Sequence, residues 1–108
     1  MIEITNINSK DNFLIAENDH ETILTIEDVR ALCEELGDGW RIPNESELLS
    51  MYNSLYLKNL GNFKNKVYWG TNKLKAFSRT IVCDFETGIV RTSHRNDVKY
   101  YFRPVRDI

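Results

Sequence analysis

The sequence predicts one α+β domain in which two helices pack on small antiparallel sheets. Apolar residues recur at the helical period over 26–36 and 48–56, whereas short β-type runs replace that period from residue 62 onward. Helices and strands are thus segregated along the chain, and no strand–helix–strand alternation indicates a parallel sheet. A chain of 108 residues has room for one domain, which we expect to cover 1–108.

The chain opens with a predicted hairpin. Ile2–Ile7 alternates apolar and polar residues, and Phe13–Ala16 forms a second apolar run. The polar residues 8–12 between the two runs suit a turn. We therefore expect an N-terminal pair of antiparallel strands.

The first helix is expected over 26–36. Thr25 can cap its amino end, Asp28 occupies the capping-box position, and Gly37 can end the helix. The apolar residues between these signals follow the helical period, so one face of the helix should be buried.

The second helix has the stronger local signal. Trp40 and Ile42 alternate as in a short strand, and Asn44 then stands where it can cap a helix, with Glu47 at the reciprocal capping-box position. The helix is expected to end around 59–61. We expect Trp40, like Trp69, to belong to the core, because large aromatic residues are mostly buried.

The remaining predicted strands follow the second helix. They are 67–69, 76–85, 89–92 and the closing run 100–106, with a turn at Thr87–Gly88.

Charge is unevenly placed along the chain. Residues 1–60 hold 4 Lys and Arg against 12 Asp and Glu, whereas residues 61–108 hold 10 against 4. The two halves could form different faces, one of which attracts an anionic partner, or they could neutralise each other within the fold. No apolar run is long enough to span a membrane and no secretory signal opens the chain, so we expect a cytoplasmic protein. The alternative is a protein that reaches a surface or a phage particle by another route.

Two cysteines, Cys33 and Cys83, lie in apolar contexts without a metal-ligand spacing. We expect both to be buried thiols. A disulfide between them is the alternative that the sequence leaves open.

Four blocks of sequence carry a family resemblance. They are Ala31–Leu36, Gly39–Leu48, Tyr68–Thr71 and Phe102–Arg106. Together they resemble the lectin-like C-terminal domain of bacterial collagen-like adhesins, a domain of unknown function related to the Fibrobacter major paralogous domain and, more distantly, to the formylglycine-generating enzymes. The resemblance covers roughly residues 25–108.

This resemblance implies a C-type lectin-like fold in which both chain ends join one small sheet and a second sheet presents loops. It implies adhesion or carbohydrate binding, with oxidative enzymes as a specialised branch. Many secreted relatives pair a cysteine matching Cys33 with one in the closing motif, where this chain has Pro104. The missing partner agrees with a reducing compartment.

The sequence favours a binding module over an enzyme. The calcium motifs of lectins of this fold are not intact, and Asn96–Asp97 is better read as a turn, so we expect no metal and no cofactor. Cys83, the one cysteine of the C-terminal half, is expected to be inert in an apolar strand, which disfavours formylglycine-type oxidation.

The candidate binding surface combines cations, amides and an aromatic ring. Such a mixture suits anionic glycans, because arginine offers a planar fork to sulfate or carboxylate and tyrosine a face to a sugar ring. The alternative is a solvated loop without a ligand. The candidate residues are Arg79, Arg91, His94, Arg95, Asn96, Asp97, Lys99 and Tyr100.

The charge pattern also suits other partners. A protein partner could take the place of the glycan, and the opposite charges of the two halves could drive a homo-oligomer, as in a structural protein of a surface or phage assembly. Nucleic acid is not expected, because the cations are interrupted and no reading motif is present. Arg103 and Arg106 of the closing motif are expected to be structural, pairing with helix carboxylates.

Overall fold

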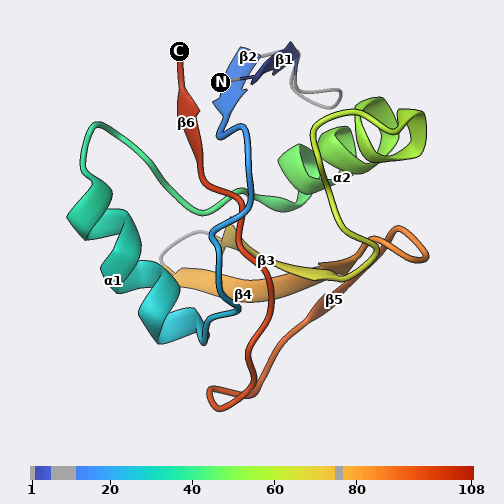
Figure 1. Ribbon diagram of the computed structural model, residues 1–108. Helices are drawn as coiled ribbons and strands as arrows, with labels where there is room; N and C mark the ends of the chain where they lie inside the picture. The colour runs from blue at the N-terminus through green and yellow to red at the C-terminus, as the bar shows by residue number, and fades with distance from the viewer. Residues whose placement is uncertain (1, 6–11, 75–76) are drawn as a thin grey trace.

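The computed structural model describes residues 2–5, 12–74 and 77–108, and their secondary structure confirms the α+β class (Figure 1). In the first antiparallel sheet, β1 (Ile2–Thr5) pairs with β2 (Asn12–Ile15), and β2 pairs with β6 (Val105–Asp107). Both ends of the described chain therefore lie in one small sheet. The turn expected at 8–12 falls largely outside the described residues.

The second antiparallel sheet has the strand order β3-β4-β5. It comprises β3 (Val67–Leu74), β4 (Phe77–Asp84) and β5 (Ile89–Thr92). The first of these strands is longer than the expected run 67–69, because its pairing with β4 continues through eight residue pairs to the distal end of the hairpin. Cross-strand pairing, which a single strand does not reveal, sets this length.

Both helices begin where the capping residues predict. In α1 (Ile26–Leu36), the hydroxyl of Thr25 accepts a hydrogen bond from the third amide of the helix. In α2 (Glu45–Ser54), Asn44 and Glu47 form a complete capping box, each side chain bonding the other residue's amide at 2.9 Å. The short 3-10 helix η1 (Tyr56–Lys58) follows α2. Local sequence thus places both helix starts correctly, whereas α2 ends at Ser54, before the expected end at 59–61.

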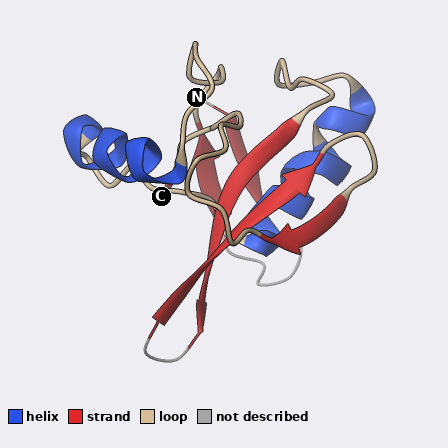
Figure 2. Ribbon diagram, turned by 90° about the horizontal axis from the view of Figure 1, so that it is seen from below, coloured by secondary structure: helices blue, strands red, loops and turns tan. Residues whose placement is uncertain are grey.

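The β3-β4-β5 sheet separates two apolar clusters. Alternate residues along a strand face opposite sides of a sheet. Tyr68, Ile81 and Cys83 face the cluster that includes α2, whereas Trp69 and Val82 face the cluster that includes α1. The two helices accordingly lie on opposite sides of this sheet (Figure 2). The pleat thereby assigns residues 67–72, 78–84 and 89–92 to either the α1 side or the α2 side.

The expectation that Trp40 is a core residue is wrong. Trp69 is 0% exposed, and its indole N–H donates to the carbonyl of Leu24 at 2.7 Å, whereas Trp40 is only partly buried. The strand expected at 40–42 is a single bridge between Arg41 and Val105. Because one bridge does not make a sheet, the side carrying Trp40 remains open.

The closing arginines also differ from the expectation. Arg103 is buried, but its carboxylate partner is Asp19 of the loop before α1, with Nε and Oδ1 2.8 Å apart, not a helix residue. The guanidinium carbon of Arg106 lies 5.1 Å from the centre of the Trp40 ring. The α2 carboxylate of Glu47 instead forms an ion pair with Arg41, with Nη2 and Oε2 2.6 Å apart.

Replacing Arg103 should be the more damaging of the two closing substitutions. Arg103→Met leaves the buried Asp19 carboxylate without its cation, so we expect the free energy of unfolding to fall by about 3–5 kcal/mol. Arg106→Met, at a partly exposed position, should cost about 1 kcal/mol or less. Urea denaturation of both variants measures the difference, and equal losses would contradict the assignment.

The two tryptophans should differ in the same way. Trp69→Ala removes a fully buried ring and should cost about 3–5 kcal/mol. Trp40→Ala should cost about 1–2 kcal/mol, because part of that ring already contacts water. Thermal and urea unfolding compare the variants. A larger loss of unfolding free energy in Trp40→Ala than in Trp69→Ala would contradict this assignment of the core.

Candidate functional site

The structure divides the residues of the predicted binding surface. Arg91 pairs with Val82 across β5 and β4, so both side chains lie on the α1 side of the sheet. Arg79 has the parity of Ile81 and lies on the α2 side, where its strand neighbour is Asn72. Because the pleat sends Arg79 and Arg91 to opposite faces, one ligand cannot contact both from the same side.

A small cavity gathers part of the predicted set. Arg91, His94, Arg95 and Tyr100 line a hollow of about 140 Å³, and the ring of Tyr100 packs edge-on against Trp69 at 5.0 Å between centres. Pockets that hold whole small ligands usually measure about 300–1,000 Å³. This cavity can therefore take a substituent such as a carboxylate, but not a complete sugar ring.

The other predicted residues lie around this cavity. Arg95 and Asp97 form an exposed bidentate ion pair, in which Nε donates to Oδ1 at 3.1 Å and Nη2 donates to Oδ2 at 2.9 Å. That bonding raises the pKa of Arg95 and lowers the pKa of Asp97. Asn96 is exposed, and Lys99 lines a separate hollow of about 430 Å³ that also contacts Tyr100. Much of the charge of Arg95 is thus already compensated.

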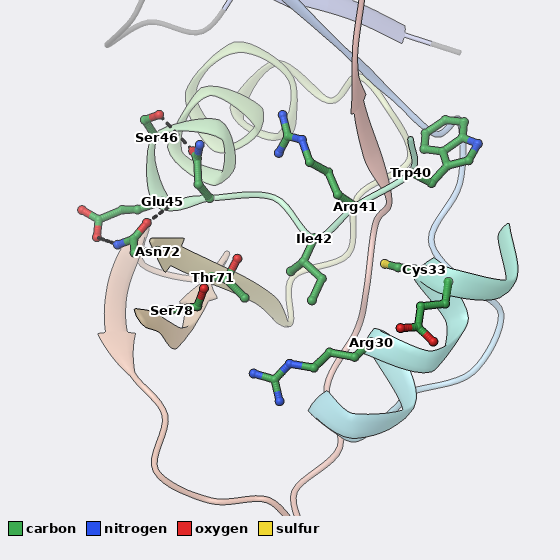
Figure 3. Close-up of a pocket in the computed structure, with 12 residues that line it drawn as sticks. Arg30, Cys33, Trp40, Arg41, Ile42, Glu45, Ser46, Thr71, Asn72 and Ser78 are labelled. Carbon is green, nitrogen blue, oxygen red and sulfur yellow. Dashed lines mark hydrogen bonds between the residues drawn. The ribbon is translucent and has the colours of Figure 1, made fainter. Parts of the chain in front are cut away.

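A larger groove lies between α1, the amino end of α2 and the distal part of the β3–β4 hairpin (Figure 3). We call it the α1–β3 groove. Its volume is about 900 Å³, within the usual range for ligand pockets. The side chains that line it include Arg30, Trp40, Glu45, Thr71, Asn72 and Ser78. Sequence patterning missed this site, because its walls come from four separate segments.

The wall at α2 is held by paired polar contacts. The side-chain oxygen of Asn72 accepts from the amide of Glu45 at 3.0 Å, and its NH₂ group donates to the Glu45 carboxylate at 3.1 Å. Asn72 thereby satisfies one of the free amides at the amino end of α2. The side-chain amide of Asn72 and the carboxylate of Glu45 are thereby fixed in position, and both can still form further hydrogen bonds with a ligand.

Arg41 closes the neighbouring part of this wall. Its guanidinium donates to both oxygens of Glu47, at 2.7 and 2.6 Å, and to Asp107 at 2.7 Å. The hydrogen bonds that Arg41 donates to Glu47 are the main reason that the pKa of Arg41 is raised. Its charge is therefore committed to two carboxylates of the protein.

Arg30 is the more available cation of the groove. It lies on the exposed side of α1, its guanidinium points into the groove, and its Nη2 donates to the hydroxyl of Thr80 at 3.1 Å (Figure 3). Among the described residues, no carboxylate forms an ion pair with it. Thr71 and Ser78 share the sheet face of Thr80 by strand parity, so hydroxyls line the wall opposite α1.

The two cysteines are free, so a disulfide between them is absent. Cys83 is buried as expected, whereas Cys33 is only half-buried and lines the α1–β3 groove. Burial raises the pKa of Cys33 to about 11 and that of Cys83 to about 12. Both thiols are therefore protonated at neutral pH.

No protein-family model matches this chain, and no curated protein matches it. Within 2–5, 12–74 and 77–108, no cluster of three metal-ligating side chains occurs, and no helix is long and apolar enough to cross a membrane.

The sequence does contain a signal for the groove. Arg30 is the one basic residue of the acidic helix 26–36, and Trp40 directly follows a turn.

The raised thiol pKa values predict slow alkylation. At pH 8, Cys33 in the folded protein should react with iodoacetamide about a hundredfold more slowly than an unhindered thiol, and its rate should rise about tenfold per pH unit up to about pH 10. Mass spectrometry of the labelled protein measures this rate. In urea both cysteines should react at ordinary rates, and rapid labelling of folded Cys33 at pH 8 would contradict its environment.

Proposed function

We propose that the chain is a non-catalytic, calcium-independent binding module with a C-type lectin-like fold, and that its ligand is a saccharide held in the α1–β3 groove. The observation that carries this proposal is the groove itself. Its volume of about 900 Å³ suits a small ligand, and it offers amide, carboxylate, hydroxyl and guanidinium groups beside an indole.

The arrangement of elements supports the lectin-like part of the proposal. Both ends of the described chain lie in one small sheet, two helices flank a second sheet, and long loops connect them. The four sequence blocks of the resemblance fall on α1, the start of α2, β3 and the closing segment that runs into β6. Since one fold can carry many functions, the groove and not the fold indicates the ligand.

The chemistry of the groove favours hydroxyl recognition over attraction of a polyanion. Glu34 and Glu45 line it together with Arg30 and Arg41, and Arg41 is committed to Glu47 and Asp107. A neutral saccharide can donate to the carboxylates and accept from Arg30 and Asn72, with Trp40 at one end of the groove (Figure 3). The anionic glycan expected at Arg91–Tyr100 remains a separate prediction.

The non-catalytic part rests on the state of the candidate reactive groups. The thiol of Cys33, which reaches the groove, is held protonated by its raised pKa of about 11. The carboxylate of Glu45 is engaged by Asn72. Neither arrangement provides the activated nucleophile or paired base that covalent catalysis uses.

Tryptophan fluorescence tests the proposal. Neutral mono- and disaccharides of glucose, galactose, mannose and N-acetylglucosamine are titrated in EDTA and again in calcium. We expect at least one to change the emission equally in both buffers. The signal should vanish in Trp40→Phe, because the remaining Trp69 is fully buried.

Groove variants locate the binding. Asn72→Ala and Arg30→Gln should each weaken it about two- to tenfold, as expected for one lost hydrogen bond. Asn53→Ala is the matched control, because Asn53 is exposed on α2 and bonds only its own helix, at the carbonyl of Leu49. Absence of binding by every sugar, or equal weakening in the control, would sink the proposal.

A further inference from the structure

The two edges of the β3-β4-β5 sheet differ. Along the outer edge of β3, the amide of Trp69 donates to Tyr101 and the amide of Tyr101 donates to Val67, both at 3.0 Å. The amide of Thr71 donates to Pro43 at 2.9 Å. The closing segment and the chain before α2 therefore cover this edge.

The outer edge of β5 has no such cover within the described ranges. The amide of Ser93 donates to Thr80 of β4 at 3.0 Å, and residues that bond a given neighbour alternate along an antiparallel strand. The amides and carbonyls of Val90 and Thr92 therefore point away from β4. No described residue forms a hydrogen bond with them, and Figure 1 shows β5 at the rim of the molecule.

A basic cavity lies directly beside this edge. Arg91, His94 and Arg95 line the hollow of about 140 Å³ on the α1 side of β5. Arg95 is paired with Asp97, whereas Arg91 is exposed and has no ion-pair partner among the described residues. An open row of main-chain groups thus borders a cavity sized for one acidic side chain.

We propose that the outer edge of β5 binds an extended acidic segment of a partner protein. The segment adds a fourth strand to the sheet through main-chain hydrogen bonds with Val90 and Thr92. An Asp or Glu on its α1-facing side enters the small cavity, where Arg91 donates to the carboxylate. This surface is independent of the α1–β3 groove, which lies at the other edge of the sheet.

A second copy of the chain fits this edge less well. Two β5 strands paired antiparallel about a twofold axis place Arg91 of one copy next to Arg91 of the other on the same face. Like charges at neighbouring cross-strand positions are destabilising. The uncompensated positive charge therefore favours an acidic partner.

A sulfated polysaccharide is also a weaker fit. It would use the charge of Arg91 but none of the main-chain groups of Val90 and Thr92 at strand spacing. The cavity is too small for a sugar ring, as its 140 Å³ volume shows. Hydrogen bonding to the main chain of β5 therefore distinguishes an acidic peptide from a sulfated polysaccharide in an experiment.

Nuclear magnetic resonance with hydrogen exchange tests the proposal on the full chain. The probe is a capped heptapeptide, Thr-Glu-Val-Glu-Val-Glu-Thr. At saturation, exchange of the Val90 and Thr92 amides should slow by about tenfold or more, because both gain an acceptor. The Arg91 amide already faces β4, so its exchange rate should change little.

Three variants separate main-chain from charge recognition. Thr92→Pro removes an outward amide that makes no bond to β4, a site where an edge strand tolerates proline, and should weaken peptide binding about fivefold. Arg91→Gln should weaken it about tenfold. Arg79→Gln is the matched control on the opposite face and should leave the affinity unchanged, as should Asn72→Ala in the groove.

Circular dichroism checks that each variant is folded. Thr92→Ala retains the backbone amide and is therefore the control for the loss of the threonine side chain in Thr92→Pro. The proposal is overturned if the peptide does not bind or if the two edge amides stay unprotected. It is also overturned if dextran sulfate binds more tightly than the peptide and loses nothing in Thr92→Pro, since the face is then a charge-driven anion site.

Discussion

The buried guanidinium of Arg103 is the contact on which the loops of this protein depend. Its Nε bonds Asp19, its Nη1 bonds the carbonyls of Ala16 and Glu17, and its Nη2 bonds the carbonyl of Asn62. It thus holds together the loop before α1, the loop before β3 and the closing segment. None of these segments has a regular ladder of backbone hydrogen bonds of its own. Their buried backbone carbonyls therefore need a side-chain donor such as Arg103.

Asp19 extends this network to the sheet. Its second carboxylate oxygen accepts from the hydroxyl of Tyr68, which in turn accepts from the amide of Lys64 at 2.8 Å. Burial is the main reason that the pKa of Tyr68 is raised, which keeps the phenol protonated as a donor. The closing segment is thereby fixed along β3, where Tyr101 covers one sheet edge and leaves β5 as the open one.

Local sequence was sufficient for the helices but not for the site. Thr25, Asn44 and Glu47 act within one turn of chain, so their patterns predicted both helix starts. Arg103 and Asp19 are 84 positions apart, and no periodicity reports such a pairing. The α1–β3 groove was missed for the same reason, because it is a space between segments that meet only after folding.

Trp40 illustrates how a local sequence pattern can predict the wrong burial. The expected strand at 40–42 is a single bridge, Arg41 turns inward to Glu47, and the partly buried Trp40 lines the α1–β3 groove. The side of Trp40 then faces the groove rather than a second layer. Alternation along a sequence indicates which side chains can share a side, but only tertiary packing decides which of them are covered.

The same pleat explains why the basic half of the sequence does not form one basic face. Arg79 and Arg91 lie on adjacent strands, yet their parity sends them to opposite sides of the sheet. Positive charge is consequently dispersed, and the local excess lies at Arg91 beside the open edge. A surface that combines one free cation with unpaired main-chain groups is selective for extended acidic chains, whereas a polyanion needs several cations on one side.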